Sequence, residues 1–336
     1  MVDSFRWERI PLRNDAGQIP ILGFGTLIAD PEATKIATGD ALEAGFRHFD
    51  CAERYRNERE VGEALRIGRA GGNITRDELF VTTKVWNTNH RPERVRPAFD
   101  GSLERLGLDY LDLYLIHTPF TFKPGADQDP RDENGDVIYD KDTTLIDTWK
   151  AMEELVDGGR CRAIGLSDVD LGKLMSVYEA ARIKPAVIQI EAHPYLPETE
   201  LLRFCKEKDI VLLAFVPLGH GMKPGPIEDP VILSIAEQIG KTPAQVLLAW
   251  AAQRGTALLT TPKSPARDRE FRRLPSSRGC DGCDRFDRDQ AEIQPRGRNR
   301  QSRLHSARQL IGKPKKAAIL VVPAEQRPFH YRRRTP

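Results

Sequence analysis

The chain has few cysteines, almost no net charge and no long apolar run, and each absence excludes a class of protein. Five cysteines in 336 residues are too few and too scattered for a disulfide framework. A formal net charge of +2 gives no reason to expect a nucleic acid or an anionic membrane as partner. No stretch approaches the ~20 apolar residues of a membrane span, and the opening MVDSFRWERIPLRND has no secretory signal. We therefore expect a soluble, cytoplasmic protein.

Two ligand motifs are also missing or incomplete. The segment LGFGTLIAD (22–30) lacks the G-x-G-x-x-G spacing that an open doubly wound nucleotide-binding sheet would place after its first strand. Cys280 and Cys283 form a C-x-x-C pair, but there is no second cysteine pair and His305 is the nearest histidine downstream. Because a structural zinc ion needs four ligands, we expect no metal.

What the sequence does contain is a repeated alternation of short apolar runs with longer amphipathic stretches, typical of βα units. A hairpin over 9–22, turning at 14–17, precedes them. Helical spacing of apolar residues predicts helices at 57–70, 91–107 and 144–159. Eight such alternations favour a closed (β/α)8 TIM barrel over an open sheet. The predicted strands are 22–26, 46–50, 79–84, 111–117, 163–167, 187–191, 211–216 and 257–261.

Polar residues lie where these strands end, and in a barrel such positions converge on one pocket. The long connection 119–142, rich in Pro, Gly and Asp, follows the fourth strand on the same face. Any one of these polar residues could simply be solvated, but six together favour a site. They are Asp50, Lys84, His117, Ser167, Gln189 and Lys263.

The segment HFDCAERYRNEREVGEAL (48–65) resembles the aldo-keto reductase signature H-x-D-x-A-x-x-Y-x-N-E-x-x-V-G-x-A-L. The resemblance continues through LFVTTKVWN, LDLYLIHTP, DTWKAMEELVDGGRCRAIGLSD, VIQIEAHPYLP and LTTPKS, and covers roughly residues 8–270. It implies an enzyme that reduces an aldehyde or ketone by hydride transfer from NADPH. Residues 1–269 would form the barrel, and its partner would be a small carbonyl compound bound by a monomer.

Carried over residue by residue, the resemblance makes Asp50, Tyr55, Lys84 and His117 the catalytic tetrad. The chemistry agrees with that assignment. A phenol with a pKa near 10 is a poor acid at neutral pH, and an adjacent ammonium lowers that pKa by stabilising the phenolate. Lys84 would supply the ammonium, Asp50 would hold Lys84, and His117 would orient the substrate carbonyl. Tyr55 would then donate the proton. The alternatives are that Tyr55 is an ordinary packing tyrosine and that His117 has a structural role.

The resemblance also implies a set of cofactor-binding residues. Ser167, Asp168 and Gln189 resemble the positions that hold the nicotinamide carboxamide, and Phe215 resembles a stacking tyrosine. Lys263, Ser264 and Arg269 resemble the group that binds the adenosine 2′-phosphate of NADPH, for which cationic donors are suited. The complete predicted set is Gly25, Thr26, Ser167, Asp168, Gln189, Phe215, Leu218, Lys263, Ser264 and Arg269.

Besides Phe215, the sequence departs from the family pattern at four positions within the predicted barrel. Asp168 replaces an asparagine and loses its amide donor, and Val216 replaces a serine that contacts the pyrophosphate. Leu27 and Thr118 stand where related enzymes often have tryptophans that line the substrate pocket. The pocket of this protein is therefore expected to have fewer aromatic walls.

The largest departure begins near residue 270. The segment REFRRLPSSRGCDGCDRFDRDQ is rich in arginine and lacks helical periodicity. A neighbouring reading frame of codons for Arg-Arg-Leu-Pro encodes Asp-Val-Ser-Pro, which a family member could carry here. We hypothesise that residues 270–336 are out of frame; the alternative is a genuine, disordered basic tail.

Two other functions remain open. A barrel of this kind can be a non-catalytic nucleotide-binding subunit with a regulatory or scaffold role. The chain could also be an inactive product of a damaged gene. An intact set of Asp50, Tyr55, Lys84 and His117 argues against the first, while Asp168 and the altered tail leave both open.

Overall fold

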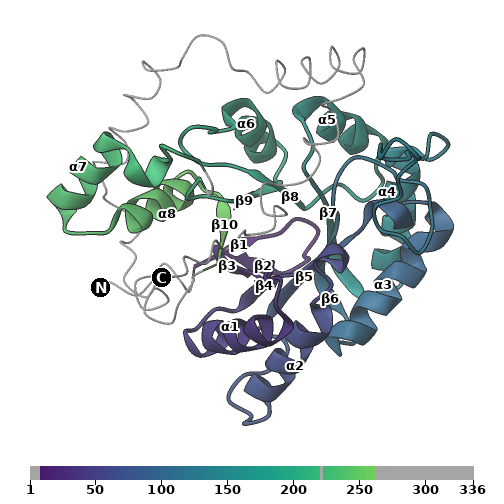
Figure 1. Cartoon of the computed structure of the whole chain (residues 1–336), viewed down its shortest axis with the longest axis horizontal. Coiled ribbons are helices and arrows are strands. Elements are labelled where there is room, and N and C mark those ends of the chain that lie inside the picture. Colours follow the sequence, from purple (N-terminus) through teal and green to yellow (C-terminus); the bar gives the residue numbers. More distant parts are fainter. Residues whose placement is uncertain (1–7, 220–221, 262–336) are drawn as a thin grey trace, which may run out of the picture.

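The structure is a computed structural model that describes residues 8–219 and 222–261. Eight parallel strands close into a barrel in which β10 pairs with β3, seen nearly end-on in Figure 1. The predicted (β/α)8 barrel is therefore confirmed. Its strands are β3 (Leu22–Gly25), β4 (His48–Asp50), β5 (Phe80–Val85), β6 (Leu111–Ile116), β7 (Cys161–Ser167), β8 (Val187–Glu191), β9 (Val211–Phe215) and β10 (Ala257–Thr260).

The helices form a ring around the barrel (Figure 1). Several begin with local signals in the sequence: Asp30 accepts a hydrogen bond from the backbone of Ala33, and Thr144 forms a capping box with Asp147, which satisfies otherwise unpaired amides. The helices of the described chain are α1 (Pro31–Glu43), α2 (Glu58–Arg69), α3 (Pro92–Leu106), α4 (Leu145–Asp157), α5 (Leu171–Ala180), α6 (Thr199–Glu207), α7 (Pro230–Ile239) and α8 (Pro243–Gln253), with short 3-10 turns η2 (Glu53–Tyr55), η3 (Asn87–Asn89) and η4 (Pro226–Glu228).

Predicted element bounds agree with the structure to within about two residues. The second predicted strand, at 46–50, begins later, at His48. Phe46 instead donates its backbone N–H to Ala41, and Gly45 has a φ of 97°. These two residues therefore belong to the turn that ends α1, because the chain needs a left-handed residue there before it can enter the barrel.

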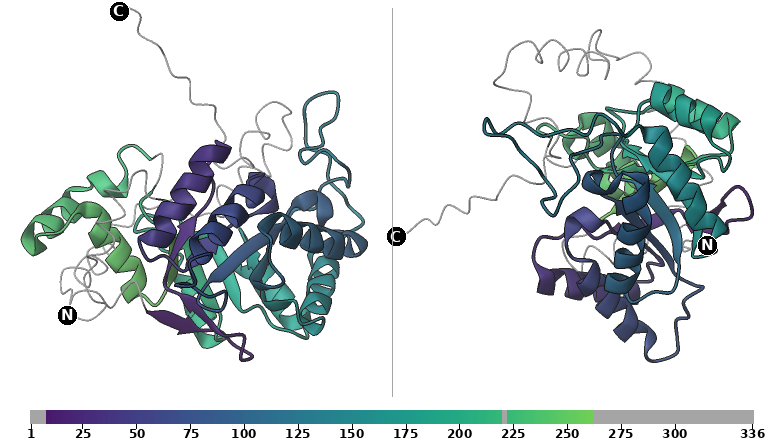
Figure 2. Two further views of the ribbon diagram at one scale, coloured as in Figure 1. Left: turned by 90° about the horizontal axis from the view of Figure 1, so that it is seen from below. Right: turned by 90° about the vertical axis from the view of Figure 1, so that its right-hand side faces the viewer.

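The predicted hairpin closes the amino end of the barrel. Strands β1 (Arg9–Pro11) and β2 (Gln18–Pro20) are antiparallel. Leu12 and Ile19 pack in one apolar cluster with inward-facing strand residues that include Leu113 and Leu115. Figure 2 shows the hairpin and the connection 119–142 at opposite ends of the barrel. The carboxyl end, where polar side chains were predicted to meet, is therefore the end left for a site.

Side chains alternate between the barrel interior and the layer under the helices. On β6, Leu113 and Leu115 belong to the interior cluster, whereas Tyr114 and Ile116 belong to the cluster beneath the helices. Gly165 on β7 is required by close packing, because a Cβ there would lie 2.2 Å from the Val187 carbonyl oxygen. This tight, regular barrel fixes the directions of the side chains at its carboxyl end.

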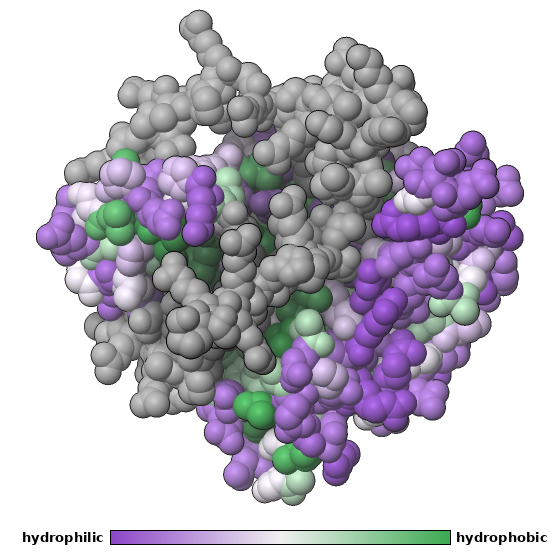
Figure 3. Space-filling model, in the orientation of Figure 1, coloured by the Kyte–Doolittle hydropathy of each residue, from purple (hydrophilic) through white to green (hydrophobic). Residues whose placement is uncertain are grey.

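Polar and apolar residues are distributed unevenly over the face seen in Figure 3. Figure 3 shows hydrophilic residues over the side formed by α3, α4 and the 119–142 connection, with hydrophobic residues nearer α1 and α2. Ile36 and Ile67 on those two helices are 55% and 50% exposed. Within residues 8–219 and 222–261, no helix has both the length and the apolar character of a membrane span.

Candidate active site

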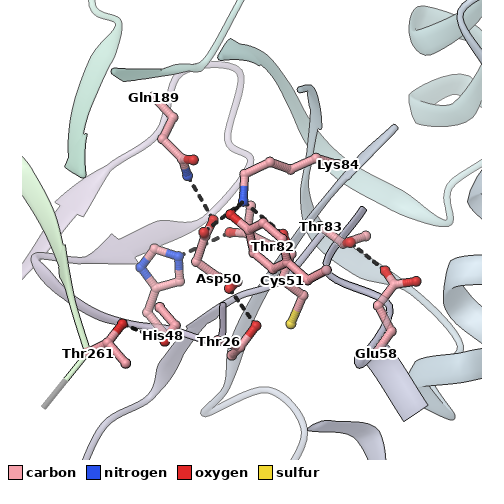
Figure 4. Close-up of polar contacts among 12 residues, drawn as sticks. Thr26, His48, Asp50, Cys51, Glu58, Thr82, Thr83, Lys84, Gln189 and Thr261 are labelled. Atoms are coloured by element: carbon pink, nitrogen blue, oxygen red, sulfur yellow. Dashed lines mark hydrogen bonds and ion pairs between the residues drawn. The ribbon is translucent and has the colours of Figure 1, made fainter. Parts of the chain in front are cut away.

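A buried lysine forms the centre of the site. Lys84 on β5 is fully buried, and its Nζ lies 2.7 Å from Asp50 Oδ2 on β4 and 2.8 Å from the Cys51 carbonyl oxygen (Figure 4). Burying an ammonium is costly unless it is paired and hydrogen-bonded. Both oxygens meet that requirement, so they also fix the direction of the ammonium group.

Tyr55 lies beside this ammonium. It ends the turn η2, and its Oη is 3.4 Å from Lys84 Nζ. The lysine nitrogen also lies 5.0 Å from the centroid of the tyrosine ring. Arg56, the next residue, has a φ of 59°, which reverses the chain between the turn and α2. The tyrosine predicted as proton donor therefore presents its hydroxyl to the predicted lysine.

His117 directly follows β6 and faces Tyr55. The two ring centroids are 5.7 Å apart, and the ring of Trp86 lies 5.1 Å from His117 on another side. Burial, reinforced by the positive charge of Lys84, lowers the pKa of His117 well below its usual 6.5. The imidazole is therefore neutral at physiological pH, when it carries one N–H that can be donated to a carbonyl oxygen.

Asp50 is held by more than its lysine. Gln189 on β8 donates its side-chain amide to Asp50 Oδ1 at 2.7 Å, and Thr26 donates its hydroxyl to the Asp50 carbonyl at 2.9 Å. Figure 4 shows Thr26, Lys84 and Gln189 converging on Asp50; they come from the residue after β3, from β5 and from β8. The structure thus brings all four predicted tetrad residues together and adds Gln189 as a support for Asp50.

The predicted cofactor residues lie around the same end of the barrel. Ser167 ends β7, and the backbone N–H of Asp168 donates to the Gln189 carbonyl at 2.9 Å. Asp168 has a φ of 58°, a left-handed conformation that aspartate and asparagine tolerate better than most residues. The three residues predicted to hold the carboxamide are therefore adjacent.

The remaining predicted cofactor residues are spread around the rim. The Gly25 carbonyl accepts from the Thr261 hydroxyl at 2.7 Å, and Phe215 ends β9. Leu218 packs against the main hydrophobic core. Val216 has a φ of 52°, a costly conformation for a β-branched residue. Lys263, Ser264 and Arg269, as well as Cys280 and Cys283 and the whole segment 270–336, lie outside the described residues.

Sequence reasoning missed the aromatic wall beside His117. Trp86 donates its indole N–H to the Gln128 carbonyl at 2.7 Å and packs edge-on against Phe122. Arg54 lies over its ring at 5.3 Å and pairs with Asp129 at 2.6 Å. Trp86 directly follows β5, the strand that carries the predicted site residue Lys84. Its position at this strand end could have indicated that it lies beside the site. These contacts fasten the connection 119–142 to the site.

The two positions without the pocket tryptophans of related enzymes differ in their surroundings. Thr118 donates its hydroxyl to Asn87 Oδ1 at 3.0 Å, so this position is polar and is tied to η3. Leu27 lies between β3 and α1 and is partly exposed, with no contact that assigns it a role. Trp86 supplies an aromatic wall beside His117, and the expectation of fewer aromatic walls than in related enzymes stays a prediction.

This geometry can be compared with known proteins. A family model described as the Aldo/keto reductase family matches residues 22–270. The chain belongs to the aldo/keto reductase family and is an enzyme of that class, as its signature predicted. The match ends near the point where the sequence departs from the family pattern; the division into 1–269 and 270–336 stays a prediction.

Similar curated proteins carry family names. Aldo-keto reductase family 1 member A1 from Gallus gallus is 45% identical over 261 residues, covering 74% of this chain and 79% of the relative. Aldo-keto reductase family 1 member C3 from Pongo abelii is 43% identical over 271 residues, covering 76% and 83%. The solved structure of the aldose reductase from Schistosoma japonicum matches with a TM-score of 0.79 and 38% identity, covering 84% of this chain and 92% of that one.

Proposed function

We propose that the protein reduces a small-molecule aldehyde or ketone to the alcohol, with hydride from NADPH and a proton from Tyr55. One observation carries the proposal: a fully buried ammonium lies between the Asp50 carboxylate and the Tyr55 phenol oxygen, at 2.7 and 3.4 Å. The names of the relatives, among them an aldose reductase, agree with carbonyl reduction.

The lysine makes the tyrosine a better acid. A nearby positive charge stabilises the phenolate that remains after the proton leaves, and so lowers the phenol pKa. Asp50 and the Cys51 carbonyl hold the ammonium in place, so it need not move during the reaction. Electrostatic groups fixed in advance are the more effective ones, because no reorganisation is needed when charge develops.

The neutral His117 orients the substrate. Its ring lies edge-on to Tyr55, so a carbonyl oxygen between the two can accept hydrogen bonds from both. The buried Nδ1 of His117 has no hydrogen-bond partner among the described residues. A protonated histidine would compete with Tyr55 as the acid, but the lowered pKa prevents this. The proton is therefore assigned to the Tyr55 hydroxyl.

The residues around β7 and β8 suit a nicotinamide carboxamide. The cofactor would supply the hydride when bound. Because Gln189 gives its amide N–H to Asp50, it offers its oxygen as an acceptor, and Asp168 offers carboxylate oxygens. Both match the carboxamide NH2 group, while the Ser167 hydroxyl is the donor for the carboxamide oxygen. Phe215 at the end of β9 would cover the ring.

The preference for NADPH rests on the sequence after β10. Lys263 and Arg269 would form charge-assisted hydrogen bonds with the 2′-phosphate, each contributing about 1.5–3 kcal/mol to binding. Changing both to Ala should weaken NADPH binding far more than NADH binding, as measured by quenching of protein fluorescence. Equal weakening of the two cofactors would show that neither residue recognises the 2′-phosphate.

Binding and turnover assays with the wild-type chain test the function as a whole. We expect NADPH to bind and to be consumed in the presence of a generic aldehyde. Binding without turnover would support the alternative of a non-catalytic nucleotide-binding barrel. Neither binding nor turnover would support a damaged product, and reading the coding bases around codon 270 would then show whether the frame is the cause.

A further inference from the structure

A second buried carboxylate lies close to the site but outside the tetrad. Glu58 is the first residue of α2, three residues after Tyr55, and is only 1% exposed. Its Oε1 accepts the Thr83 hydroxyl at 2.5 Å. Its Oε2 accepts from Ser102 at 3.2 Å and from Arg105 at 2.8 Å. A buried carboxylate is tolerated only with such partners, so this one is tightly fixed.

The contact with Thr83 connects Glu58 to the strand that carries the lysine. Thr83 precedes Lys84 on β5, and alternation along the strand directs their side chains to opposite sides. Lys84 meets Asp50 at the carboxyl end of the barrel, whereas Thr83 meets Glu58 on the other side of the strand (Figure 4). The Lys84 ammonium also lies 3.4 Å from the Tyr55 hydroxyl. One residue of β5 therefore holds the start of α2, and the next holds the ammonium beside Tyr55.

This connection is one of several that hold the segment carrying Tyr55: Arg54 pairs with Asp129 at 2.6 Å, and Asn57 donates to the Thr26 carbonyl at 2.7 Å. The turn η2 has only three residues, and its internal bonds join Tyr55 to Ala52 and Arg56 to Glu53. On the far side of Lys84, Glu53 accepts the backbone N–H of Trp86 at 3.1 Å. The segment that carries Tyr55 is therefore attached to β5 through Glu58, and to Trp86, the residue after β5, through Glu53.

We propose that Glu58 is a positioning residue that sets the distance between Tyr55 and Lys84 through Thr83, and thereby sets the acidity of Tyr55. The proposal rests on the function proposed above. With an effective dielectric constant near 20, lengthening the distance between the Tyr55 oxygen and the ammonium from 3.4 Å to about 4 Å or slightly more raises the phenol pKa by roughly 0.5–0.8 unit. Loss of the Glu58–Thr83 contact should therefore be visible as a shift in the pH dependence of the reduction rate.

The test compares two substitutions that leave the charge unchanged. Each removes one hydroxyl that donates a hydrogen bond to the Glu58 carboxylate. Thr83→Val removes the contact to β5, and Ser102→Ala removes the contact to α3; both hydroxyls are fully buried. The measurement is kcat/KM for NADPH-dependent reduction against pH, whose alkaline limb reports loss of the acid. We expect Thr83→Val to move this limb upward by about 0.5 pH unit or more, and Ser102→Ala to leave it in place.

Thermal unfolding and NADPH fluorescence titrations control for a general loss of structure, since both variants should destabilise similarly and bind cofactor normally. If Thr83→Val does not fold, Thr83→Ala and Thr83→Ser replace it, because only the serine keeps the hydroxyl and should retain the wild-type profile. An unmoved limb in the hydroxyl-free variant, or an equal shift in Ser102→Ala, would overturn the proposal. A wild-type enzyme without NADPH turnover would refute the proposed function instead.

Discussion

The two ends of the barrel each contain a buried aspartate, cationic side chains and a tyrosine among the described residues, yet these groups are arranged differently. At the amino end, Asp112 accepts from the Val81 backbone at 2.9 Å and pairs with Arg76 at 2.8 Å and Arg162 at 3.1 Å. At the carboxyl end, Asp50 pairs with Lys84 at 2.7 Å. The two ends have the same types of residue, and they differ in which cationic side chain pairs with the aspartate and in the direction of its charged group.

The cationic groups lie against different parts of the two tyrosines, Tyr110 and Tyr55. The guanidinium groups of Arg76 and Arg162 lie over the Tyr110 ring, 3.9 and 4.2 Å from its centroid. Lys84 instead places its ammonium 3.4 Å from the Tyr55 oxygen. A planar guanidinium stacks on an aromatic face and stabilises the fold, whereas a compact ammonium acts as a point charge. Directing the charge at the phenol oxygen is what makes a tyrosine acidic.

Removing the hydroxyl of Tyr55 or that of Tyr110 should give the largest difference in turnover between the two ends of the barrel. Tyr55→Phe should reduce turnover by roughly 10²-fold or more, as expected for loss of a general acid, while NADPH binding stays near the wild-type level. Tyr110→Phe keeps its stacked ring and should turn over normally. Steady-state rates and cofactor fluorescence measure both. Turnover in Tyr55→Phe equal to that in Tyr110→Phe would exclude Tyr55 as the acid.

Removing one cation from each end should separate catalysis from stability. Lys84→Met leaves the Asp50 charge buried without its cation, which costs about 3–5 kcal/mol, and it also removes the group that acidifies Tyr55. Arg162→Met leaves Asp112 paired with Arg76, and Arg162 is 44% exposed, so the cost should be about 1 kcal/mol or less. Urea unfolding and turnover measure the two effects. A Lys84→Met enzyme with wild-type turnover and pH profile would contradict the assignment.

Acid should destabilise the protein through buried histidines, without involving the arginines of the amino end. Burial lowers the pKa of His48 and His90 to about 3, and lowers that of His117 well below 6.5. The folded state therefore binds fewer protons than the unfolded state, so this stability is complete above pH 6.5 and is lost as pH falls. Each histidine should cost about 1.4 kcal/mol between pH 7.5 and 5.5.

Urea unfolding at the two pH values checks this expectation, and His90→Asn provides the control. It removes one of the three histidines without touching the tetrad, so its loss of stability between pH 7.5 and 5.5 should be smaller than that of the wild type by about 1.4 kcal/mol. An identical pH dependence in the two proteins would show that His90 is not held neutral.

The barrel, and the proximity of the four predicted tetrad residues, could be predicted from the sequence because their signals are local. Strands such as β8 match their predicted bounds because short apolar runs are bounded by turn residues. Asp50, Lys84 and His117 stand out as polar residues at strand ends, where parallel strands converge. The signature motif then singles out Tyr55, which lies in a turn rather than in a strand.

The supporting contacts could not be predicted, because they depend on which faces of distant elements meet. Glu58 looks like an ordinary acidic residue in the first turn of a helix, and only tertiary packing against β5 and α3 buries it. Gln189 was assigned to the cofactor, yet its amide donates to an aspartate 139 residues away. The left-handed conformation of Val216 could not be predicted either, because β-branched residues rarely adopt it.

Closure of the barrel has a consequence for how the chain is made. The strand β3 pairs with β10, and the Thr261 hydroxyl that bonds to Gly25 lies 236 residues farther along the chain. At typical synthesis rates of about 5–20 residues per second, roughly 10–50 s pass between translation of the two partners. Throughout that interval one edge of the nascent sheet cannot be paired as it is in the finished barrel. Because an unpaired strand edge can pair with other chains, we expect newly made chains to be exposed to aggregation throughout this interval.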